Sequence, residues 1–334
     1  MTNLIRQLWP SWVPDHPRIA SIAPVSETRA HTVWKVVTRT GSVFAVKYHL
    51  FARFTNGKPY DLLVVEQHVS HCLHKMGCPV PPVITTDPHY GIVIFQWCGD
   101  HTLDDCCQTG DVIHPAVFDA LLALETGFLN HHEQFAPWIA PGCSHKDLVA
   151  GWLETTQPIA DMLPDLVAHL TNKTPPAHLA SHWNALITHL AEAPAQLGPT
   201  DYNARNILID EAGNPFIIEL AKIGYDWPER RLIQYTTSLG AMRLDGRIIS
   251  LLTPETTNQY AQKAALIYKQ NPEVICTHIE AHHMVFHILA ALTCLNADHP
   301  WQNIPHRLQD ILLALQTPLF ETPQTVPLRM AFQN

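Results

Sequence analysis

The segment from residue 201 to residue 219 contains three polar side chains whose types and spacing could perform phosphoryl transfer. Asp201 and Asn206 lead into an apolar run, a Gly-Asn turn and a second apolar run that ends at Glu219. In such chemistry one carboxylate orients the acceptor hydroxyl, while an Asn and a second acidic group bind Mg²⁺ against the nucleotide phosphates. The spacing predicts that Asp201 accepts the hydroxyl proton and that Asn206 and Glu219 are oxygen ligands of a hard cation.

A lysine and a glutamate earlier in the chain could anchor the nucleotide phosphates. Lys47 lies near the end of a predicted strand over 43–48, and Glu66 lies on a predicted helix over 61–76. Paired with Glu66, the Lys47 ammonium would stay charged and would be held where it reaches the α- and β-phosphates. Each group alone could equally be an exposed charge or a turn cap, but the ordered set of five polar groups favours a phosphoryl-transfer site.

The elements that must position these groups change in character near residue 100. Before that point, runs of β-branched and aromatic residues predict strands over 32–38, 43–48 and 91–96. The first two strands are joined by a short turn and are expected to form a hairpin. Apolar residues spaced by three and four predict a single helix, over 61–76.

Amphipathic helices dominate the rest of the chain. They are predicted over 114–130, 146–155, 158–171, 177–193, 230–244, 255–269, 273–296 and 301–316. Only 206–220 is strand-like, and the proline-containing tail over 317–334 is expected to be extended on the surface. The fold class is therefore α+β, with a small β-rich lobe followed by a mainly helical lobe.

Composition and charge restrict the classes of partner. The 334 residues carry a net charge of −9, which argues against binding to nucleic acid or to an anionic membrane surface. The eight cysteines show no paired CxxC spacing and are expected to be free thiols in a reducing compartment. The N-terminus has no apolar secretory region and the longest apolar stretch is too short to span a bilayer, so a cytoplasmic protein is expected.

Other chemistry is less well supported. Neither the Gly-x-Ser-x-Gly motif of serine hydrolases nor the GxxxxGK[ST] loop of P-loop kinases occurs in the chain. His278, His282, His283 and His287 have helical spacing, but no third ligand completes a zinc site. Solvated or core-edge positions are expected for these histidines.

Several segments resemble one known family. They are Glu66 with the Gly-x-Pro-Val-Pro turn that follows it (66–81), a hinge-like segment (94–103), an Asp-x-x-x-x-Asn loop (201–206), and a strand with a Gly-x-Asp-x-Pro turn (216–228). Over about residues 20–235, with a helical continuation to about 316, the chain resembles the aminoglycoside phosphotransferase/choline kinase-like family. That family is a branch of the protein-kinase-like fold.

The resemblance implies a bilobal fold, with a nucleotide-binding lobe over 1–97 and a helical lobe over 98–334 that carries the catalytic loop and the acceptor site. It implies binding of ATP or GTP with Mg²⁺, and transfer to a hydroxyl of a small molecule that is aminoglycoside-like or amino-alcohol-like. Acidic residues could neutralise an amine-bearing acceptor; the candidates are Asp104, Asp105, Asp147 and Glu154. The protein is expected to be a monomer or a homodimer.

The same resemblance implies roles for individual residues. Asp201 would be the catalytic base, and Asn206 and Glu219 would be the Mg²⁺ ligands. Lys47 and Glu66 would be the phosphate-anchoring pair. The remaining nucleotide contacts would be the backbone at Gln96 to Cys98 against the adenine, and the side chains of Ser26 and Thr28 in the nucleotide loop.

The chain departs from the family pattern at several positions. Pro199 and Thr200 stand where the family has His-Gly, Glu219 replaces the usual Asp, and Arg231 stands where the family often has an Asp. The nucleotide loop over 25–31 contains no glycine. These departures leave a second hypothesis open, in which a kinase-fold protein binds nucleotide or a partner without transferring phosphate.

Overall fold

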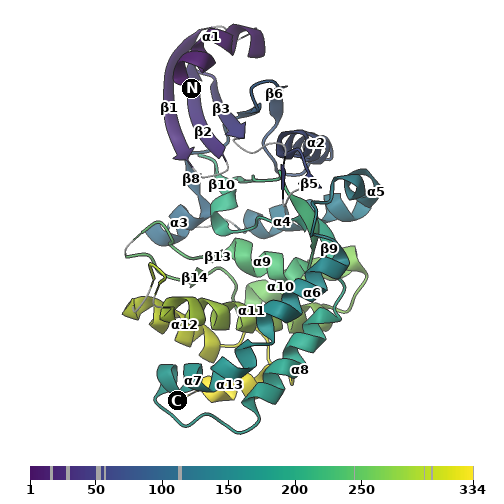
Figure 1. Cartoon of the computed structure of the whole chain (residues 1–334), viewed down its shortest axis with the longest axis vertical. Helices are drawn as coiled ribbons and strands as arrows, with labels where there is room; N and C mark the ends of the chain where they lie inside the picture. Colours follow the sequence, from purple (N-terminus) through teal and green to yellow (C-terminus); the bar gives the residue numbers. More distant parts are fainter. Residues whose placement is uncertain are drawn as a thin grey trace.

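The first hundred residues form a five-stranded antiparallel sheet with helices beside it (Figure 1). The computed structural model describes residues 1–15, 18–27, 31–49, 54–55, 58–111, 115–243, 245–296, 298–301 and 304–333. The sheet has the order β1-β2-β3-β7-β6, from the strands β1 (Ile19–Glu27), β2 (His31–Thr38), β3 (Val43–His49), β6 (Val83–Asp87) and β7 (Ile92–Gln96). The predicted hairpin and the strand over 91–96 are confirmed, because β2 pairs with β3 and β3 pairs with β7. A short pair, β4 (Phe54–Thr55) and β5 (Lys58–Pro59), precedes the next helix.

The prediction of a single helix in this region is wrong, because a second helix, α1 (Thr2–Trp12), packs on the sheet. Its side chains Ile5 and Trp9 are fully buried, and the rings of Trp9 and Phe44 meet edge to face at 5.3 Å. Pro10 lies inside the helix and obscures its pattern in the sequence. Because so short a helix is marginal by itself, burial of its apolar face against the sheet is what stabilises it.

The predicted helix over 61–76 is confirmed as α2 (Leu62–Lys75). The Asp61 carboxylate caps its first turn by accepting hydrogen bonds from the amides of Leu63 and Val64. Beyond its last turn, Gly77 takes the left-handed conformation at φ 79°, which a residue with a Cβ rarely adopts. Glu66 lies on the same buried face as Leu63, so the helix carries a carboxylate toward the sheet.

Helices make up most of the remaining chain (Figure 1). They are α3 (Leu103–Thr109), α4 (Ala116–Asn130), α5 (His132–Phe135), α6 (His145–Thr156), α7 (Ile159–Thr171), α8 (Leu179–Ala191), α9 (Pro228–Thr236), α10 (Pro254–Tyr268), α11 (Pro272–Leu295), α12 (Pro305–Gln316) and α13 (Val326–Phe332). The predicted helix over 230–244 ends earlier, at Thr236, where β13 (Thr237–Ser238) pairs with β14 (Ile249–Ser250).

The tail over 317–334 is not extended throughout as expected, because α13 forms within it and buries Leu328 and Phe332 completely. Pro327 lies in the first turn of α13, where its missing N–H costs no helical hydrogen bond. The proline pattern was therefore compatible with a helix start. The apolar contacts that hold α13 come from other helices.

Two small sheets position the segment between residues 196 and 226. Strand β9 (Gln196–Pro199) pairs with β12 (Ile223–Asp226), while β10 (Ile207–Ile209) pairs with β11 (Pro215–Ile217) and with β8 (His101–Thr102). The loop with Asp201 and Asn206 therefore leaves one sheet and enters the other. Fixing both ends of a loop on rigid strands limits the conformations that its side chains can reach.

The four histidines of α11 are buried, so the solvated interpretation is wrong. His278, His282, His283 and His287 are each at most 5% exposed, and the His282 ring lies 5.5 Å from that of Trp227. Burial lowers the pKa of His278 and of His287 to about 4, and lowers those of His282 and His283 well below the usual value. These side chains are therefore neutral parts of the core.

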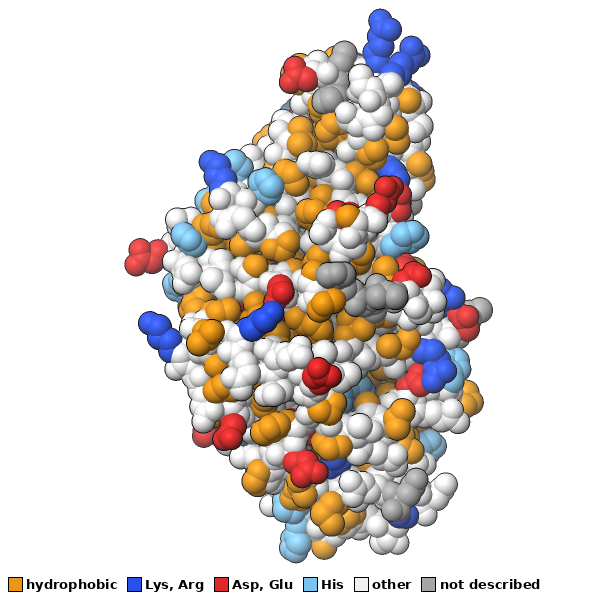
Figure 2. Space-filling view, turned by 180° about the vertical axis from the view of Figure 1, so that it is seen from behind, with side chains coloured by type: hydrophobic (Ala, Val, Ile, Leu, Met, Phe, Trp, Pro, Cys, Tyr) orange, Lys and Arg blue, Asp and Glu red, His pale blue; other side chains and the backbone are white. Residues whose placement is uncertain are grey.

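The surface is mixed in character. On the face shown in Figure 2, apolar atoms extend across the middle of the molecule, and basic and acidic side chains are scattered over the rest of the surface. Among the described residues, no helix has both the length and the apolarity needed to cross a membrane.

Buried neutral histidines predict that stability falls with acid. His278 and His287 are protonated in the unfolded chain below about pH 6.5 but not in the folded chain until about pH 4, so the unfolded state binds more protons between these values. At pH 5 the free energy of unfolding should be about 2 kcal/mol lower per such histidine. Urea unfolding from pH 5 to pH 8 measures this free energy.

Two variants test the role of the buried histidines. His287→Gln should weaken the dependence of the free energy of unfolding on pH, whereas His182→Gln, at an exposed site on α8, should leave it unchanged. An equal dependence on pH in the two variants would contradict the interpretation.

Candidate active site

One buried ammonium joins three segments of the chain. Lys47 on β3 is 4% exposed, and its Nζ donates hydrogen bonds of 2.8 Å to Glu66 Oε1 on α2 and of 2.8 Å to Glu219 Oε2 beyond β11. The structure thus brings together the two residues expected at the phosphates and one of the two expected at the metal. An ammonium in such a place needs this compensation, because burial of an unpaired charge is costly.

A second donor to Glu66 was not anticipated from the sequence. His49 Nε2 lies 2.7 Å from Glu66 Oε2, and both side chains are buried. His49 follows Lys47 by two residues on β3, so both side chains project from the same face of the strand. This alternation is the sequence signal for His49, and it indicates a contact with Glu66 only because α2 packs beside this face of β3.

The pKa values reflect these contacts. Burial by itself would lower the pKa of Lys47, but the Glu219 and Glu66 carboxylates outweigh burial and raise it above the ordinary value. Burial would likewise raise the pKa of Glu66, but the Lys47 charge and the hydrogen bond with His49 lower it to about 2. The lysine and its partner glutamate are therefore both charged at neutral pH.

The loop between β9 and β10 is closed by its own side chains. Asn206 Nδ2 donates to the main-chain oxygen of Asp201 at 2.9 Å and to its Oδ1 at 3.3 Å, and Asn203 Nδ2 donates to the same Oδ1 at 3.3 Å. The Ile218 amide donates a hydrogen bond of 2.9 Å to the main-chain oxygen of Asn206, which connects the loop to the segment that carries Glu219. Asp201 and Glu219 are thus positioned by one hydrogen-bonded unit.

The donor set fits a hard divalent cation. Burial, and then the Glu219 carboxylate, raise the pKa of Asp201 above its ordinary value. The Asn206 amide nitrogen is used within the loop, which turns its amide oxygen the other way. Glu219 takes φ 64°, a conformation that is rare outside glycine and that is concentrated at functional positions. Carboxylate and amide oxygens are the ligands that Mg²⁺ prefers.

The loop is anchored although it lacks the His-Gly of the family pattern. The Thr200 amide donates to the Lys222 oxygen at 3.1 Å, and the Tyr202 hydroxyl donates to the buried Asp226 carboxylate. Asp226 also accepts from the Trp227 amide at 2.8 Å and from Arg230. Tyr202 and Asp226 therefore form a contact between the loop and β12 for which the sequence offered only the Gly-x-Asp-x-Pro spacing.

The expected nucleotide contacts are placed less completely. The Cys98 thiol donates to the Gln96 oxygen at 3.5 Å in the segment that follows β7, and burial followed by Asp210 raises the pKa of Cys98 to about 12. Ser26 on β1 is opposite Val33 on β2, and Val33 is opposite Lys47 on β3. Ser26 and Lys47 therefore lie in the same cross-strand row of the sheet. Thr28 lies outside the described residues.

Three of the four acidic candidates for acceptor binding have structural partners. Asp104 is buried and accepts from the Ser238 hydroxyl at 2.6 Å and from the amide of Leu239. Asp105 and Asp147 lie in the first turns of α3 and α6, where each completes a capping box by accepting a hydrogen bond from the N-cap amide. Glu154 is exposed on α6. The engaged carboxylates are held in place by backbone and hydroxyl donors, which reduces their availability to a ligand.

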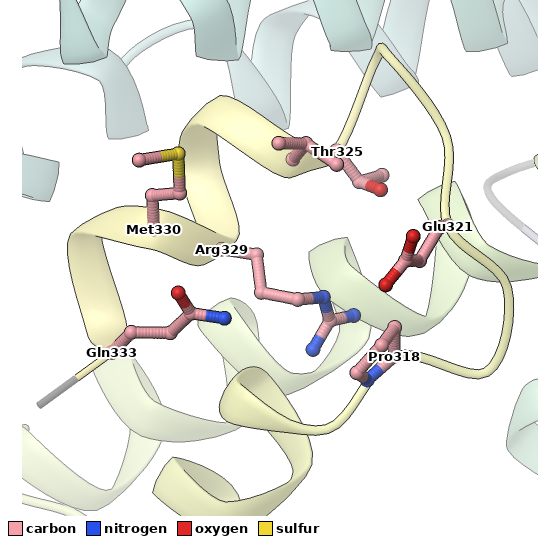
Figure 3. A pocket seen from close by; sticks show the side chains of 7 residues that line it. Pro318, Glu321, Thr325, Arg329, Met330 and Gln333 are labelled. Atoms are coloured by element: carbon pink, nitrogen blue, oxygen red, sulfur yellow. The ribbon is translucent and has the colours of Figure 1, made fainter.

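One pocket among the described residues lies far from this cluster. It has a volume of about 200 Å³ and is lined by Pro318, Glu321, Thr325, Val326, Arg329, Met330 and Gln333. Figure 3 shows these side chains around α13 and the turn before it. Figure 1 places α13 at the opposite end of the molecule from the sheet that carries Lys47, so this pocket is no part of the Lys47–Asp201 cluster.

Comparison with known proteins connects this architecture to solved structures. No family model matches the sequence, and no curated protein matches it. A choline/ethanolamine kinase family protein from Mesorhizobium loti has a TM-score of 0.50 at 13% identity, over 99% of this chain and 98% of that one. A macrolide 2′-phosphotransferase from Brachybacterium faecium has a TM-score of 0.50 at 9% identity, over 87% and 93%. These likenesses show that the chain has the bilobal kinase-like α+β fold expected from its motifs.

Removing Lys47 tests the ion cluster directly. Lys47→Met leaves Glu66 buried with less compensation, so the free energy of unfolding should fall by about 3–5 kcal/mol. Adding Glu66→Gln should restore part of this loss, because it removes the uncompensated charge. Chemical denaturation at pH 7 measures both variants, with the exposed Lys75→Met as the control. A loss in Lys47→Met no larger than in the control would contradict the assignment.

Proposed function

We propose that the protein transfers the γ-phosphoryl group of ATP to a hydroxyl of a small molecule, with Mg²⁺ bound between the nucleotide and the loop. The observation that supports this most strongly is the convergence of five polar residues from distant segments. Lys47 contacts both Glu66 and Glu219, and Glu219 lies close enough to Asp201 to raise its pKa. Phosphoryl transfer depends mainly on positioning and on charge neutralisation, which is what such a cluster supplies.

Asp201 would orient the acceptor hydroxyl and take its proton. A carboxylate with a raised pKa is a better proton acceptor than an ordinary one, and burial with the Glu219 charge raises the pKa of Asp201. The hydrogen bonds from Asn203 and Asn206 leave Asp201 Oδ2 for the hydroxyl. The new bond would join the acceptor oxygen to phosphorus as the bond to the β-phosphate oxygen breaks.

Lys47 would bind the phosphates, with Glu66 and His49 fixing its position. When bound, Mg²⁺ would neutralise charge on the phosphates, and Glu219 and Asn206 would be its protein ligands. For Glu219 to bind Mg²⁺, its carboxylate would give up part of its contact with Lys47. The nucleotide phosphates would then take the place of that carboxylate beside the Lys47 ammonium. Main-chain groups of Gln96 and Cys98 would face the adenine, and GTP would be the alternative nucleotide.

The acceptor class follows from weaker support. The two structures with a TM-score of 0.50 are named as a choline/ethanolamine kinase family protein and a macrolide 2′-phosphotransferase. Choline, ethanolamine and macrolides are all small molecules with hydroxyl groups, and the first two are amino alcohols, which supports an amino-alcohol-like acceptor. The aminoglycoside-like alternative rests on the resemblance of the sequence motifs. A panel of such hydroxyl compounds, with phosphorylation read by mass spectrometry, is the direct screen.

The role of Asp201 can be tested by one substitution. Asp201→Asn should lower phosphorylation of the best acceptor by about 10²–10⁴-fold, because the amide cannot take the hydroxyl proton. Affinity for ATP should be unchanged, since Asp201 is not proposed to contact the nucleotide. Asp165→Asn, on the exposed face of α7, is the matched control. Equal turnover in the two variants would refute the assignment.

The metal site can be tested through stability. If MgATP binds the folded state, saturation at 100 times the Kd should stabilise it by about 2.7 kcal/mol. Glu219→Ala should remove the Mg²⁺-dependent part of the shift, while Glu219→Asp should keep most of it. Shifts that need no Mg²⁺, or binding without turnover on every acceptor of the panel, would favour the alternative of a kinase-fold protein that only binds nucleotide.

A further inference from the structure

A second buried ion pair lies directly beneath the strand that leads into the Asp201 loop. Arg231 on α9 and Glu125 on α4 are 1% and 4% exposed. Their contact is bidentate, with Arg231 Nε donating to Glu125 Oε1 at 2.6 Å and Nη2 donating to Oε2 at 2.8 Å. Such a fork fixes orientation as well as charge.

The third nitrogen of the same guanidinium reaches β9. Arg231 Nη1 donates to the main-chain oxygen of Gln196 at 3.2 Å. Strand β9 pairs with β12. The guanidinium therefore joins α4 and α9 to the first residue of β9, the strand that leads into the loop.

The backbone of β9 is shaped to admit this side chain. A Cβ placed on Gly198 would lie 2.7 Å from Arg231 Cζ and 2.9 Å from Nη1. A real side chain there would displace either the guanidinium or the strand. Gly198 faces Gly224 of β12 in the register, and Pro199 then leads into Thr200 and Asp201. The close approach of Arg231 thus explains the glycine.

Tyr235 connects the helix of Arg231 with the loop. It lies one helical turn after Arg231 on α9 and is 1% exposed. Its ring lies 6.1 Å, centroid to centroid, from the ring of Tyr202, the residue that follows Asp201. Helix α9 therefore meets the loop at a second point.

We propose that Arg231, held by Glu125, is a positioning residue that sets the place of β9 and hence of Asp201 in this chain. The inference rests on the proposed phosphoryl transfer only for its kinetic consequence. Arg231 acts through β9 and contacts no substrate. It supports the loop from α9, in addition to the hydrogen bonds that the Thr200 amide and hydroxyl donate to the main-chain oxygen of Lys222.

Hydrogen exchange of the full chain tests the proposal without reference to activity. Arg231→Lys keeps the charge but loses the fork, so amides of residues 196–206 should exchange at least about tenfold faster while β7 is unaffected. Arg329→Lys is the matched control, because Arg329 forms an equally buried pair with Glu280 on α11, remote from the loop. The control should lower stability without changing exchange over 196–206.

Two further variants separate positioning from general stability. Gly198→Ala should reproduce the exchange effect through steric displacement of the guanidinium, whereas Gly151→Ala has open space around it and should not. Exchanging the charges (Glu125→Arg with Arg231→Glu) should recover stability relative to the single variants. It should not recover protection of 196–206, because a glutamate at 231 cannot donate to Gln196.

With MgATP and the best acceptor, Arg231→Lys should lower kcat while leaving the KM for ATP unchanged. Unaltered exchange over 196–206 in both Arg231→Lys and Gly198→Ala would overturn the proposal. Faster exchange there in a protein that turns over no acceptor would support the positioning role while refuting the proposed function, so the two failures are distinguishable.

Discussion

The structure depends on compensating one buried positive charge. Lys47 is only 4% exposed, so its ammonium is compensated by Glu66 from α2 and by Glu219 from beyond β11. The contact to Glu219 spans 172 residues of sequence. Because a buried charge without partners is costly, the sheet, α2 and the loop region can coexist only in an arrangement that brings these groups together. The same arrangement creates the cluster that could bind phosphates.

A second principle is that the loop with Asp201 is positioned from several directions at once. Asn206 closes it internally, Thr200 and Tyr202 attach it to the segment that includes β12, and Arg231 attaches β9 to α9 and α4. Each of these contacts involves main-chain or buried polar groups, which are expensive to leave unpaired. The departures from the family pattern at Pro199, Thr200 and Arg231 therefore do not leave the loop unsupported.

The sequence predicted the elements whose signal is local. The hairpin over 32–48, the helix at 61–76 and the strand over 91–96 each follow from alternation or helical spacing within a short window. Signals of this kind fail where burial is decided by distant partners. Helix α1 is stabilised by Trp9 against the sheet, α13 by Phe332 in the helical core, and the histidines of α11 are buried by helices on several sides.

For the site, the sequence by itself determined which chemical groups are available and their order along the chain, because spacing within one loop or strand is a local property. The Asp201–Asn206 interval belongs to this class, and the order of Lys47 on a strand before Glu66 on a helix was enough to predict that the two would pair. Only the tertiary structure decided that His49 shares Glu66, that Glu219 reaches Lys47, and that Arg231 meets Glu125 across 106 residues. Those contacts result from the packing of separate elements, and the free energy that selects them is gained only when the whole fold excludes water.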